Sequence, residues 1–551
     1  MKGTIIIPLM LVAGLHSPAI SQNPSFPWAK QITGKVVDTW ATTTDNDGSI
    51  YVTGIFEDSL VLEGNVLYTF SFDPIIGNYD LFISKFNQNG ELMWIQQGGA
   101  LSEARGVDIC HDNKGNVYVI GNTLDTLITI TNDTILAPGG DALLLLKYRP
   151  DGELAWVKQS HGGWSYGEAV TTDEEDNVIS VGITISETMF EDIVIEPAID
   201  NTLYVAKHDK EGELLWLRKA EAEFGIDGVT QVTTDHEGNI YLTGSYRKKL
   251  VFGNHTVEAV SWNLGGTRDA FIVKYSPTGE ALWARTIGGV HNCWGMSVTT
   301  DESGNVYLAG FASGTTEIGD LTMDDLKDEM FIVKYDEEGD IVWAKSYGEG
   351  GDQRISHIQY ANNKLYISGL GIPKINFGDT TIISPYNQVV MVLARLDKDG
   401  NPEWITHISD HTTGGIRGFD VRGNELVFCG AFGNKVFIGD SLFVCEESLN
   451  SFVGKMVDNG VTNTDEEKGA NSPLIEMFPN PFHDQLNINL LSGTPEMVTV
   501  KITDLLGNTI LLYSTHPNPF FIDDLTSLSP GFYIIHLSAG GDKIAKKIIK
   551  Q

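Results

Sequence analysis

Short stretches of alternating apolar and polar residues recur along most of this chain, separated by turns rich in Gly, Asn and Asp. Alternation with a period of two indicates half-buried β-strands, because successive strand residues face opposite sides of a sheet. Residues 306–309, 331–335 and 341–345 are examples of such stretches. The pattern therefore predicts an all-β protein made of many short strands.

The alternating stretches belong to a sequence repeat that occurs seven times. Three motifs recur in one order: an Asp-x-x-Gly-Asn turn followed by a strand, an apolar hairpin around Gly-Asp or Gly-Asn, and a strand such as 271–275. A tryptophan follows them, in most copies after a Gly-Glu turn, at Trp28, Trp94, Trp156, Trp216, Trp283, Trp343 and Trp404. Each copy predicts four antiparallel strands, a to d, and such copies arranged radially form a β-propeller.

The order of the motifs also predicts how the ring closes. Trp28 precedes every strand of type a, whereas the last copy ends after its strand c near Met456. We therefore expect the segment around Trp28 to form the outermost strand of the last copy, which removes the exposed sheet edges. The predicted fold is a seven-bladed β-propeller over residues 22–457, followed by a small C-terminal β-sandwich.

The repeats resemble the seven-bladed β-propeller repeat family of secreted bacterial proteins (SBBP). The shared signature is Gly-Asn-Val-Tyr, then Phe-Ile-Val-Lys-Tyr, then Gly-Glu-x-x-Trp, and it extends over residues 28–457. This family has no common activity, so the resemblance implies the fold and leaves the chemistry open.

Both ends of the chain differ from the repeats. Residues 1–21 contain Lys2, an apolar run at 5–15 that is too short to span a bilayer, and small residues at Ala19 and Ser21. This arrangement predicts a secretory signal peptide cleaved before Gln22. Residues 458–473 have the polar composition of a linker, and 474–551 again alternate as in a small sandwich. No later segment is apolar enough to predict a transmembrane helix in the mature chain.

The last segment carries a set of short motifs: a Pro-Asn-Pro opening, an Asp-x-x-Gly turn, a Leu-x-x-Gly-x-Tyr-like stretch and a basic tail. Their residues are Pro479, Asn480, Pro481, Gly507, Gly531, Tyr533, Lys546 and Lys547. Residues 474–551 thereby resemble the C-terminal sorting domain of type IX secretion cargo from Bacteroidetes-type bacteria. The resemblance implies recognition by the outer-membrane translocon, and a protein secreted from, or attached to the outer surface of, a Gram-negative cell.

Charge and cysteine content exclude several classes of function. The chain has 73 acidic and 37 basic residues, a net charge of −36, and this scarcity of clustered Lys and Arg argues against nucleic-acid binding. Four cysteines are too few for a disulfide framework, although Cys429 and Cys445 could pair. The repeated Asp turns weakly suggest calcium, but we expect each Asp to accept hydrogen bonds from its own turn. No cofactor or metal is therefore expected.

The candidate ligand residues lie on the face that bears the hairpins, near the start of strand a. Dissimilar residues occupy this position in otherwise regular repeats, as an asymmetric binding pocket would require. The candidates are Asp38, Arg105, Trp164, Tyr166, Asp227, Trp294, Arg354 and Arg417. The same residues could instead only fill or solvate the mouth of the central channel, and the sequence leaves both interpretations open.

No nucleophile elbow, HExxH or phosphate-binding loop occurs in the sequence. We interpret the chain as an exported, non-enzymatic propeller that binds a glycan or protein partner in an adhesion-type role. An alternative is an extracellular polysaccharide hydrolase or lyase with Asp38 and Asp227 as acid–base carboxylates. A third possibility is a purely structural component of the cell surface.

Overall fold

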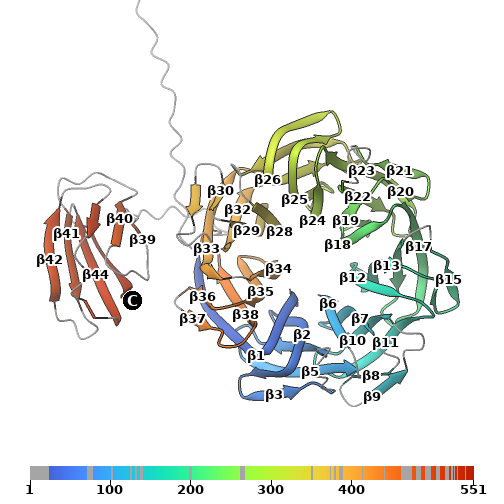
Figure 1. Cartoon of the computed structure of the whole chain (residues 1–551), viewed down its shortest axis with the longest axis horizontal. Coiled ribbons are helices and arrows are strands. Elements are labelled where there is room, and N and C mark those ends of the chain that lie inside the picture. The colour runs from blue at the N-terminus through green and yellow to red at the C-terminus, as the bar shows by residue number, and fades with distance from the viewer. Residues whose placement is uncertain are drawn as a thin grey trace, which may run out of the picture. The chain divides into compact units, whose positions relative to one another are not determined.

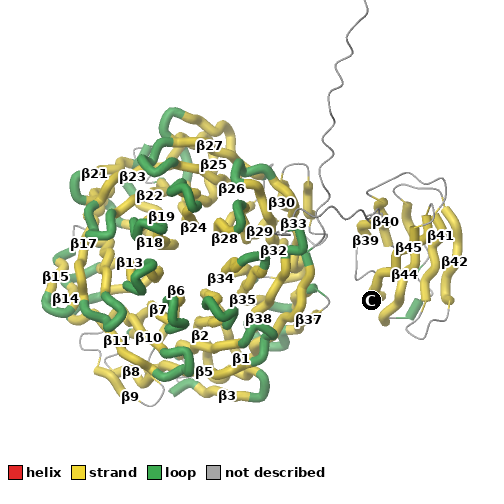
Figure 2. The backbone as a smooth tube through the Cα atoms, turned by 180° about the vertical axis from the view of Figure 1, so that it is seen from behind, coloured by secondary structure: helices red, strands yellow, loops and turns green. Residues whose placement is uncertain are grey.

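The structure is a computed structural model. It describes residues 24–550 with these gaps: 71–77, 101–102, 125–126, 131–132, 137–140, 198–200, 261–266, 349–351, 373, 378–379, 384–388, 413, 440, 461–474, 479–485, 491–497, 504–508, 516–519, 523–524, 526–527, 530 and 540–541. Throughout these described residues the regular elements are strands, and the strands pair in an antiparallel arrangement (Figure 2). Among the same residues there is no helix long and apolar enough to cross a membrane. The prediction of an all-β protein is therefore confirmed. The predicted signal peptide and nearly all of the predicted linker lie outside the described residues.

The chain divides into two compact domains, an N-terminal domain, Met1–Val461, and a C-terminal domain, Thr462–Gln551. In the N-terminal domain each sequence repeat forms a four-stranded antiparallel repeat unit. Units 1 to 3 consist of β1 (Ser25–Thr44), β2 (Ile50–Leu62), β4 (Tyr79–Phe86) and β5 (Leu92–Ala100); β6 (Ala104–His111), β7 (Val117–Thr123), β10 (Ala142–Tyr148) and β11 (Leu154–His161); and β12 (Ser165–Thr172), β13 (Val178–Thr184), β16 (Thr202–His208) and β17 (Leu214–Glu223).

The later repeat units follow the same plan. Units 4 to 7 consist of β18 (Ile226–Thr234), β19 (Ile240–Tyr246), β22 (Asp269–Tyr275) and β23 (Ala281–Gly289); β24 (Cys293–Thr300), β25 (Val306–Ile318), β26 (Leu321–Tyr335) and β27 (Ile341–Tyr347); β28 (Asp352–Ala361), β29 (Lys364–Ile372), β32 (Val389–Asp397) and β33 (Pro402–Thr412); and β34 (Gly415–Arg422), β35 (Glu425–Phe432) and β38 (Asn450–Val457). Figure 1 shows these units following one another around a ring, with strands such as β6, β12, β18, β28 and β34 toward its centre.

The first strand joins the two ends of the ring. The beginning of β1 pairs with β38, with Trp28 opposite Lys455, and the end of β1 pairs with β2, with Thr43 opposite Tyr51. One continuous strand thus serves as the outermost strand of unit 7 and the innermost strand of unit 1. This pairing covers the edge that β38 would otherwise expose.

The hairpins form short strand pairs at the perimeter. Their strands are β3 (Asn65–Tyr68), β8 (Leu127–Ile130), β9 (Asp133–Leu136), β14 (Thr188–Phe190), β15 (Ile193–Ile195), β20 (Lys249–Phe252), β21 (His255–Glu258), β30 (Lys374–Phe377), β31 (Thr380–Ile383), β36 (Lys435–Ile438) and β37 (Ser441–Val444). β8, β14 and β20 pair with β5, β11 and β17, each the outermost strand of the preceding unit. The hairpins therefore connect neighbouring units and cover their outer edges, which gives them a structural role.

The repeated tryptophan packs between units, as the repeat pattern predicts. A Cβ on Gly152 of unit 2 would lie 2.9 Å from the Trp94 ring of unit 1, so the turn glycine lies directly on that ring. Trp94 Nε1 and Lys85 Nζ donate to the same turn carbonyl, that of Pro150, at 3.1 and 2.9 Å. The spacing Gly-Glu-x-x-Trp thus encodes the contact between one repeat unit and the next.

The repeated aspartate closes its own turn. Asp112 Oδ1 accepts hydrogen bonds from the backbone N–H groups of Lys114 and Asn116, both at 2.9 Å. The hydroxyl of Tyr118 donates to the second carboxylate oxygen at 3.0 Å. The same bonds recur at Asp45, Asp235 and Asp301, which confirms that these carboxylates satisfy the turn backbone.

The cysteines are free thiols, so the open possibility of a disulfide is resolved against pairing. Cys293, Cys429 and Cys445 are buried, and Cys110 is partly buried. Burial raises the pKa of the Cys429 thiol to about 12, because the charged thiolate loses its hydration. These cysteines therefore act as small apolar core residues.

The C-terminal domain contains two antiparallel sheets. One has the order β39 (Ile475–Phe478), β40 (Leu486–Leu490), β43 (Phe520–Ile522), and the other β42 (Thr509–Thr515), β41 (Val498–Thr503), β44 (Gly531–Ala539), β45 (Asp542–Lys550). Gly531 begins β44, and the Tyr533 hydroxyl donates to the Ser529 carbonyl at 2.8 Å. Lys546 and Lys547 lie in β45. Pro479, Asn480, Pro481 and Gly507 lie outside the described residues.

Candidate functional site

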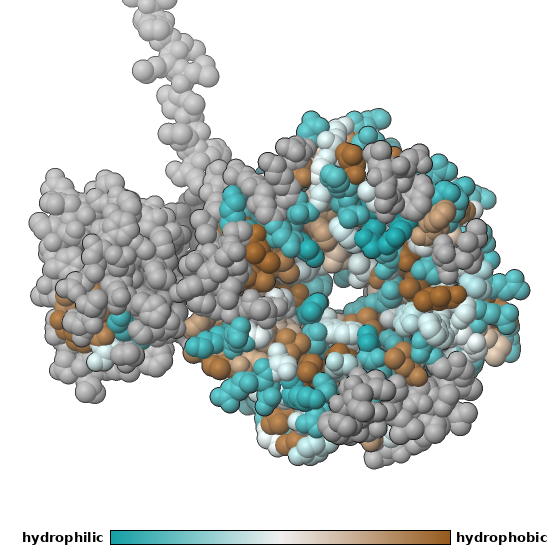
Figure 3. Space-filling model, in the orientation of Figure 1, coloured by the Kyte–Doolittle hydropathy of each residue, from teal (hydrophilic) through white to brown (hydrophobic). Residues whose placement is uncertain are grey.

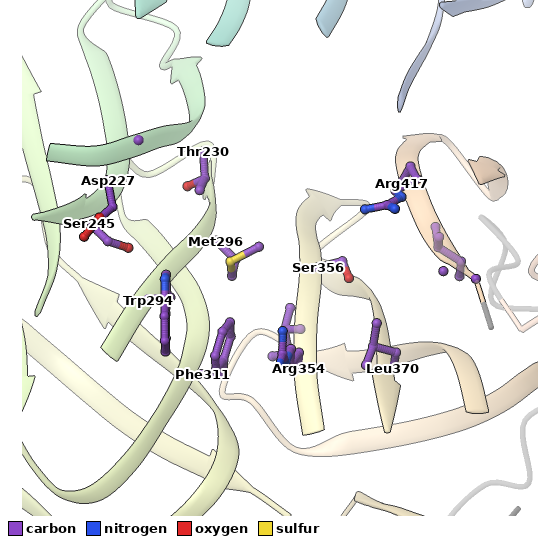
Figure 4. Close-up of a pocket in the computed structure, with 15 residues that line it drawn as sticks. Asp227, Thr230, Ser245, Trp294, Met296, Phe311, Arg354, Ser356, Leu370 and Arg417 are labelled. Carbon is purple, nitrogen blue, oxygen red and sulfur yellow. The ribbon is translucent and has the colours of Figure 1, made fainter. Parts of the chain in front are cut away.

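A pocket of about 610 Å³ lies where the innermost strands of units 4 to 7 approach one another. Figure 3 shows an opening at the centre of the ring, and Figure 4 shows the side chains that line the pocket. They come from the starts of β18, β24, β28 and β34 and from β19, β25 and β29. The polar and aromatic lining residues are Asp227, Thr230, Ser245, Trp294, Phe311, Arg354, Ser356 and Arg417.

A β-bulge at the same point of each innermost strand shapes the inner wall of this pocket. The register of pairing shifts by one residue around Thr230, Met296, Ser356 and Arg417, and all four residues line the pocket. The equivalent bulge residues of units 1 to 3 are Trp40, Val107 and Glu168. A bulge leaves the extra residue out of the regular pairing and re-aims its side chain.

The sequence analysis included Arg417 but not Thr230, Met296 or Ser356. Their signal in the sequence is a break in the alternation, because one added residue changes which face the following side chains take.

A stack of two aromatic rings and two guanidinium groups forms one side of the pocket. The Trp294 and Phe311 rings are stacked, with centroids 4.7 Å apart and planes inclined by 20°. The Arg268 guanidinium carbon lies 5.6 Å from the Trp294 ring, and that of Arg354 lies 4.9 Å from the Phe311 ring. In Figure 4 Asp227, the ion-pair partner of Arg268, and Arg354 lie on opposite sides of the ring pair. Each ring of the pair therefore contacts the other ring and one guanidinium group.

Asp227 is held by two arginines. Arg247 donates to both carboxylate oxygens, at 3.0 and 3.2 Å, and Arg268 Nε donates to one of them at 2.7 Å. The Asp227 contact raises the pKa of Arg247 further above its ordinary value. Both carboxylate oxygens of Asp227 are therefore engaged by arginine donors.

Arg354 and Arg417 are the pocket residues with accessible guanidinium groups. Arg354 donates from Nε and Nη2 to Asp352, at 2.6 and 3.1 Å, and 47% of its side chain is exposed. Arg417 Nη2 lies 3.7 Å from Asp38, and 55% of its side chain is exposed. Burial raises the pKa of Asp38, and the nearby Arg417 opposes this shift.

The structure brings some of the predicted residues together and separates others. Asp227, Trp294, Arg354 and Arg417 line the one pocket, and Asp38 contacts it through Arg417.

The remaining candidates, in units 2 and 3, do not line this pocket. Arg105 pairs with Glu103 at 2.5 Å, and the Tyr166 hydroxyl lies 3.4 Å from Asp141. Trp164 is 55% exposed.

Two further polar groups near the pocket were absent from the sequence analysis. Ser245 is 2% exposed and lines the pocket, yet its hydroxyl has no hydrogen-bond partner among the described residues. Glu168, the bulge residue of unit 3, accepts a hydrogen bond from the Val229 N–H at 2.5 Å. Loss of hydration raises the pKa of Glu168 to about 7.

Within the part of the chain that the structure describes, no three His, Cys, Asp or Glu side chains are grouped as a metal site would require. The polar groups that line the pocket are guanidinium groups, hydroxyls and the Asp227 carboxylate, and they lie beside the aromatic stack.

Residues 476–551 match the family of secretion system C-terminal sorting domains. Two curated proteins are similar to parts of the chain. An uncharacterized WD repeat-containing protein of Acanthamoeba polyphaga mimivirus is 24% identical over 277 residues, 43% of this chain and 19% of that protein. The regulatory protein FlaEY of Caulobacter vibrioides is 25% identical over 150 residues, 26% of this chain and 15% of that protein. The chain thus spans less than a fifth of the length of either relative.

Among solved structures, a variant of the Synechocystis apocarotenoid oxygenase is similar with a TM-score of 0.37 and 8% identity, over 79% of this chain and 94% of that one. A DUF4221 family member from Bacteroides vulgatus is similar with a TM-score of 0.29 and 10% identity, over 80% of this chain and 98% of that one.

Proposed function

Since the C-terminal match identifies a secreted or cell-surface protein of Bacteroidetes-type bacteria, we propose that its N-terminal domain is a seven-bladed β-propeller that binds an extracellular ligand. The ligand is a glycan or a protein, and the domain binds it without chemical conversion. Residues 1–21 are the signal peptide, 458–473 the linker and 474–551 the sorting domain that the type IX translocon recognises.

The proposed fold is supported by the repeat units and by the way the chain ends meet. The repeat units have four antiparallel strands each, and β1 pairs with both β38 and β2. Closed radial arrays of this kind commonly use the end of the central channel for binding, where loops and strand ends of several blades meet.

One observation carries the binding function: a pocket at the centre of the ring is lined by different residues in each contributing unit. At the bulge, units 4 to 7 have different residues: Thr230, Met296, Ser356 and Arg417. Two positions earlier the equivalent residues differ again: Gly228, Trp294, Arg354 and Gly415. Such variation would be unnecessary for packing alone, since the contact of a turn glycine with the tryptophan of the preceding unit recurs at Gly279, Gly339 and Gly400. It suits recognition of one asymmetric ligand.

The enzyme alternative is weakened by the pairing of Asp227 with Arg247 and Arg268, at 3.0 and 2.7 Å. A general acid or base must reach the substrate with a carboxylate oxygen, and both oxygens of Asp227 are held by arginine donors.

The test is a binding screen of the full exported chain against an array of neutral and acidic oligosaccharides and immobilised extracellular proteins. We expect saturable binding that the double substitution Arg354→Ala and Arg417→Ala abolishes. Arg149→Ala is the matched control, because Arg149 lies in a turn and pairs only with the exposed Glu153. Absence of saturable binding, or binding that the double substitution leaves intact, would overturn the proposal. Release of shortened or unsaturated oligosaccharides would identify an enzyme instead.

A further inference from the structure

The groups that the pocket offers to a ligand are polar. Trp294 and Phe311 stack on each other, and each ring also contacts a guanidinium group, that of Arg268 or Arg354, so both rings already have partners of the kind that a neutral sugar would replace. What remains accessible are the two guanidinium groups of Arg354 and Arg417 and a set of hydroxyls, those of Thr230, Ser245 and Ser356.

The charge at this pocket opposes the charge of the whole protein. Four of the ten arginines in the sequence, Arg247, Arg268, Arg354 and Arg417, lie in the pocket or contact its residues. Three carboxylates pair with them, those of Asp227, Asp352 and Asp38. Glu168 adds a fourth carboxylate beside the pocket, so the wider cluster is close to balance. The charged residues that line the pocket itself are Arg354, Arg417 and Asp227, and this excess of one positive charge in the lining favours a negatively charged ligand although the protein has a net charge of −36.

The hydrogen-bonding capacity of these arginines is only partly used. A guanidinium has five N–H donors arranged as a planar fork, which matches the paired oxygens of a carboxylate or sulfate. Among the described residues Arg354 pairs with Asp352 through Nε and Nη2 and not through Nη1, and the Arg417 guanidinium lies 3.7 Å from Asp38, beyond hydrogen-bond length. Figure 4 shows Arg417 projecting from β34 toward the open side of the pocket.

Ser245 supplies a second, independent sign of a ligand. Its hydroxyl is almost fully buried, lines the pocket, and lacks a hydrogen-bond partner among the described residues. Buried polar groups are almost always paired in folded proteins, so an oxygen or hydroxyl entering the pocket would complete this site. A pocket of about 610 Å³ is also larger than a single inorganic anion requires and is typical of organic ligands.

We propose that this pocket binds an acidic saccharide, with its carboxylate or sulfate held by Arg354 and Arg417 and one of its hydroxyls held by Ser245. The inference rests on the binding function proposed above and names the ligand class of the same site. A uronic acid and a sulfated sugar present the same anionic oxygens to the two guanidinium groups. The experiment therefore has to distinguish a uronic acid from a sulfated sugar.

The experiment is isothermal titration of the full exported chain with four probes: an oligogalacturonate, its methyl ester, a sulfated galactan oligosaccharide, and inorganic sulfate. We expect one of the two acidic oligosaccharides to bind at least about tenfold more tightly than the neutral ester, as loss of a charge-assisted hydrogen bond would predict. Arg354→Gln and Arg417→Gln should each weaken that binding about tenfold or more, and Ser245→Ala should weaken it less. Whichever acidic oligosaccharide binds identifies the source of the anionic group.

Control variants keep the outcomes distinct. Arg417→Lys retains the charge but lacks the planar fork, so we expect intermediate affinity, while Arg149→Gln should leave binding unchanged. The thermal midpoint of each variant shows whether the fold is retained. Neutral glycans that bind as tightly as acidic ones, with no effect of either arginine substitution, would overturn the acidic-ligand proposal and leave the binding function standing. Inorganic sulfate that binds as tightly as the oligosaccharides would overturn the saccharide assignment, and no saturable binding of any probe would overturn both proposals.

Discussion

At the scale of single residues, the turn glycine and the tryptophan form the contact between neighbouring repeat units. Gly152 has a φ of +88° and carries no Cβ, and both properties are needed where the turn rests on the Trp94 ring. Gly64, in a hairpin turn, has a similar φ of +85° but has no atom within 4 Å of where a Cβ would lie. The two glycines therefore separate the cost of backbone strain from the cost of steric overlap.

We expect Gly152→Ala to destabilise the N-terminal domain by about 1–3 kcal/mol more than Gly64→Ala, because only the first substitution forces a methyl group against the partly buried Trp94 ring. All 11 tryptophans lie between residues 28 and 404, so tryptophan fluorescence during urea unfolding reports on this domain alone. Equal destabilisation by the two substitutions would show that only the positive φ of these glycines opposes an alanine, and that the contact of Gly152 with the Trp94 ring adds no further cost.

Glu168 gives the N-terminal domain a pH-dependent stability. Burial raises the pKa of Glu168 to about 7, from an ordinary value of 4.5, so the folded state holds its proton more tightly than the unfolded state does. Unfolding then releases a proton between about pH 4.5 and pH 7, and the free energy of unfolding falls as the pH rises through this window.

Glu168→Gln should remove this contribution. As the pH rises across that window, the free energy of unfolding of the wild type should therefore fall relative to that of the variant, by at most about 1.4 kcal/mol per pH unit. Glu63→Gln is the control, because the contribution of Glu63 to stability depends on pH in the opposite direction. Lys30 lowers the pKa of Glu63, so its contribution is present above the unfolded-state pKa and is lost as the pH falls. Urea unfolding at pH 5, 6 and 7 measures the Glu168 difference, across which the Glu63 difference should stay constant, and measurements below about pH 4.5 should show the loss of the Glu63 contribution. Parallel curves for the wild type and Glu168→Gln between pH 5 and 7 would contradict the assignment.

At the scale of elements, the alternating pattern predicted the strands better than it predicted their contacts. Alternation indicates which face of a sheet a residue occupies, and this is a local property. The strands that it predicts within residues 295–345 agree with the positions of β24 to β27. Chain order led to the expectation that Trp28 joins the last strand, and Trp28 lies opposite Lys455. These features depend on neighbouring residues or on connectivity, which the sequence contains directly.

The bulges and the hairpin pairings depend on competition between strands that are distant in sequence. The extra residue at Met296 or Ser356 arises because the innermost strand shifts its register against the next one, and a break in the alternation marks such a residue without showing where its side chain is aimed. The stack at the pocket likewise joins Trp294 and Phe311 with arginines from the two neighbouring units. Its members could be found only after the units were placed side by side.

The closing strand β1 offers a test at this scale. Trp28 Nε1 donates to the Gln88 carbonyl at 3.2 Å, and the Trp28 ring packs on Phe86, so its removal weakens the contact between units 7 and 1. We expect Trp28→Ala to cost roughly 2–3 kcal/mol, below the range for a fully buried tryptophan, and to speed amide exchange in β38. Trp164→Ala removes an exposed tryptophan and should cost less than about 0.5 kcal/mol. Unchanged exchange in β38 would show that this part of β1 does not hold the ring closed.

At the scale of the whole molecule, the negative charge belongs to the exported repeats and not to an acidic tail. Repulsion of anionic polymers by this charge is screened beyond about 8 Å at physiological ionic strength. The arginines at the pocket can therefore act over a short range on a ligand that the rest of the surface does not attract. A site of this kind selects by close geometry and not by long-range steering.

The C-terminal domain decides where the protein is delivered, and its deletion tests this separately from folding. Removing residues 474–551 should leave the truncated chain in the periplasm, whereas the full chain reaches the cell surface or the medium, because the matched sorting family covers residues 476–551. Immunoblots of periplasmic, surface and culture fractions measure the distribution. Every tryptophan remains in the truncated chain, so its unfolding curve shows whether the repeats still fold and separates failed transport from misfolding. A folded, truncated protein on the cell surface would mean that delivery uses a signal outside the C-terminal domain.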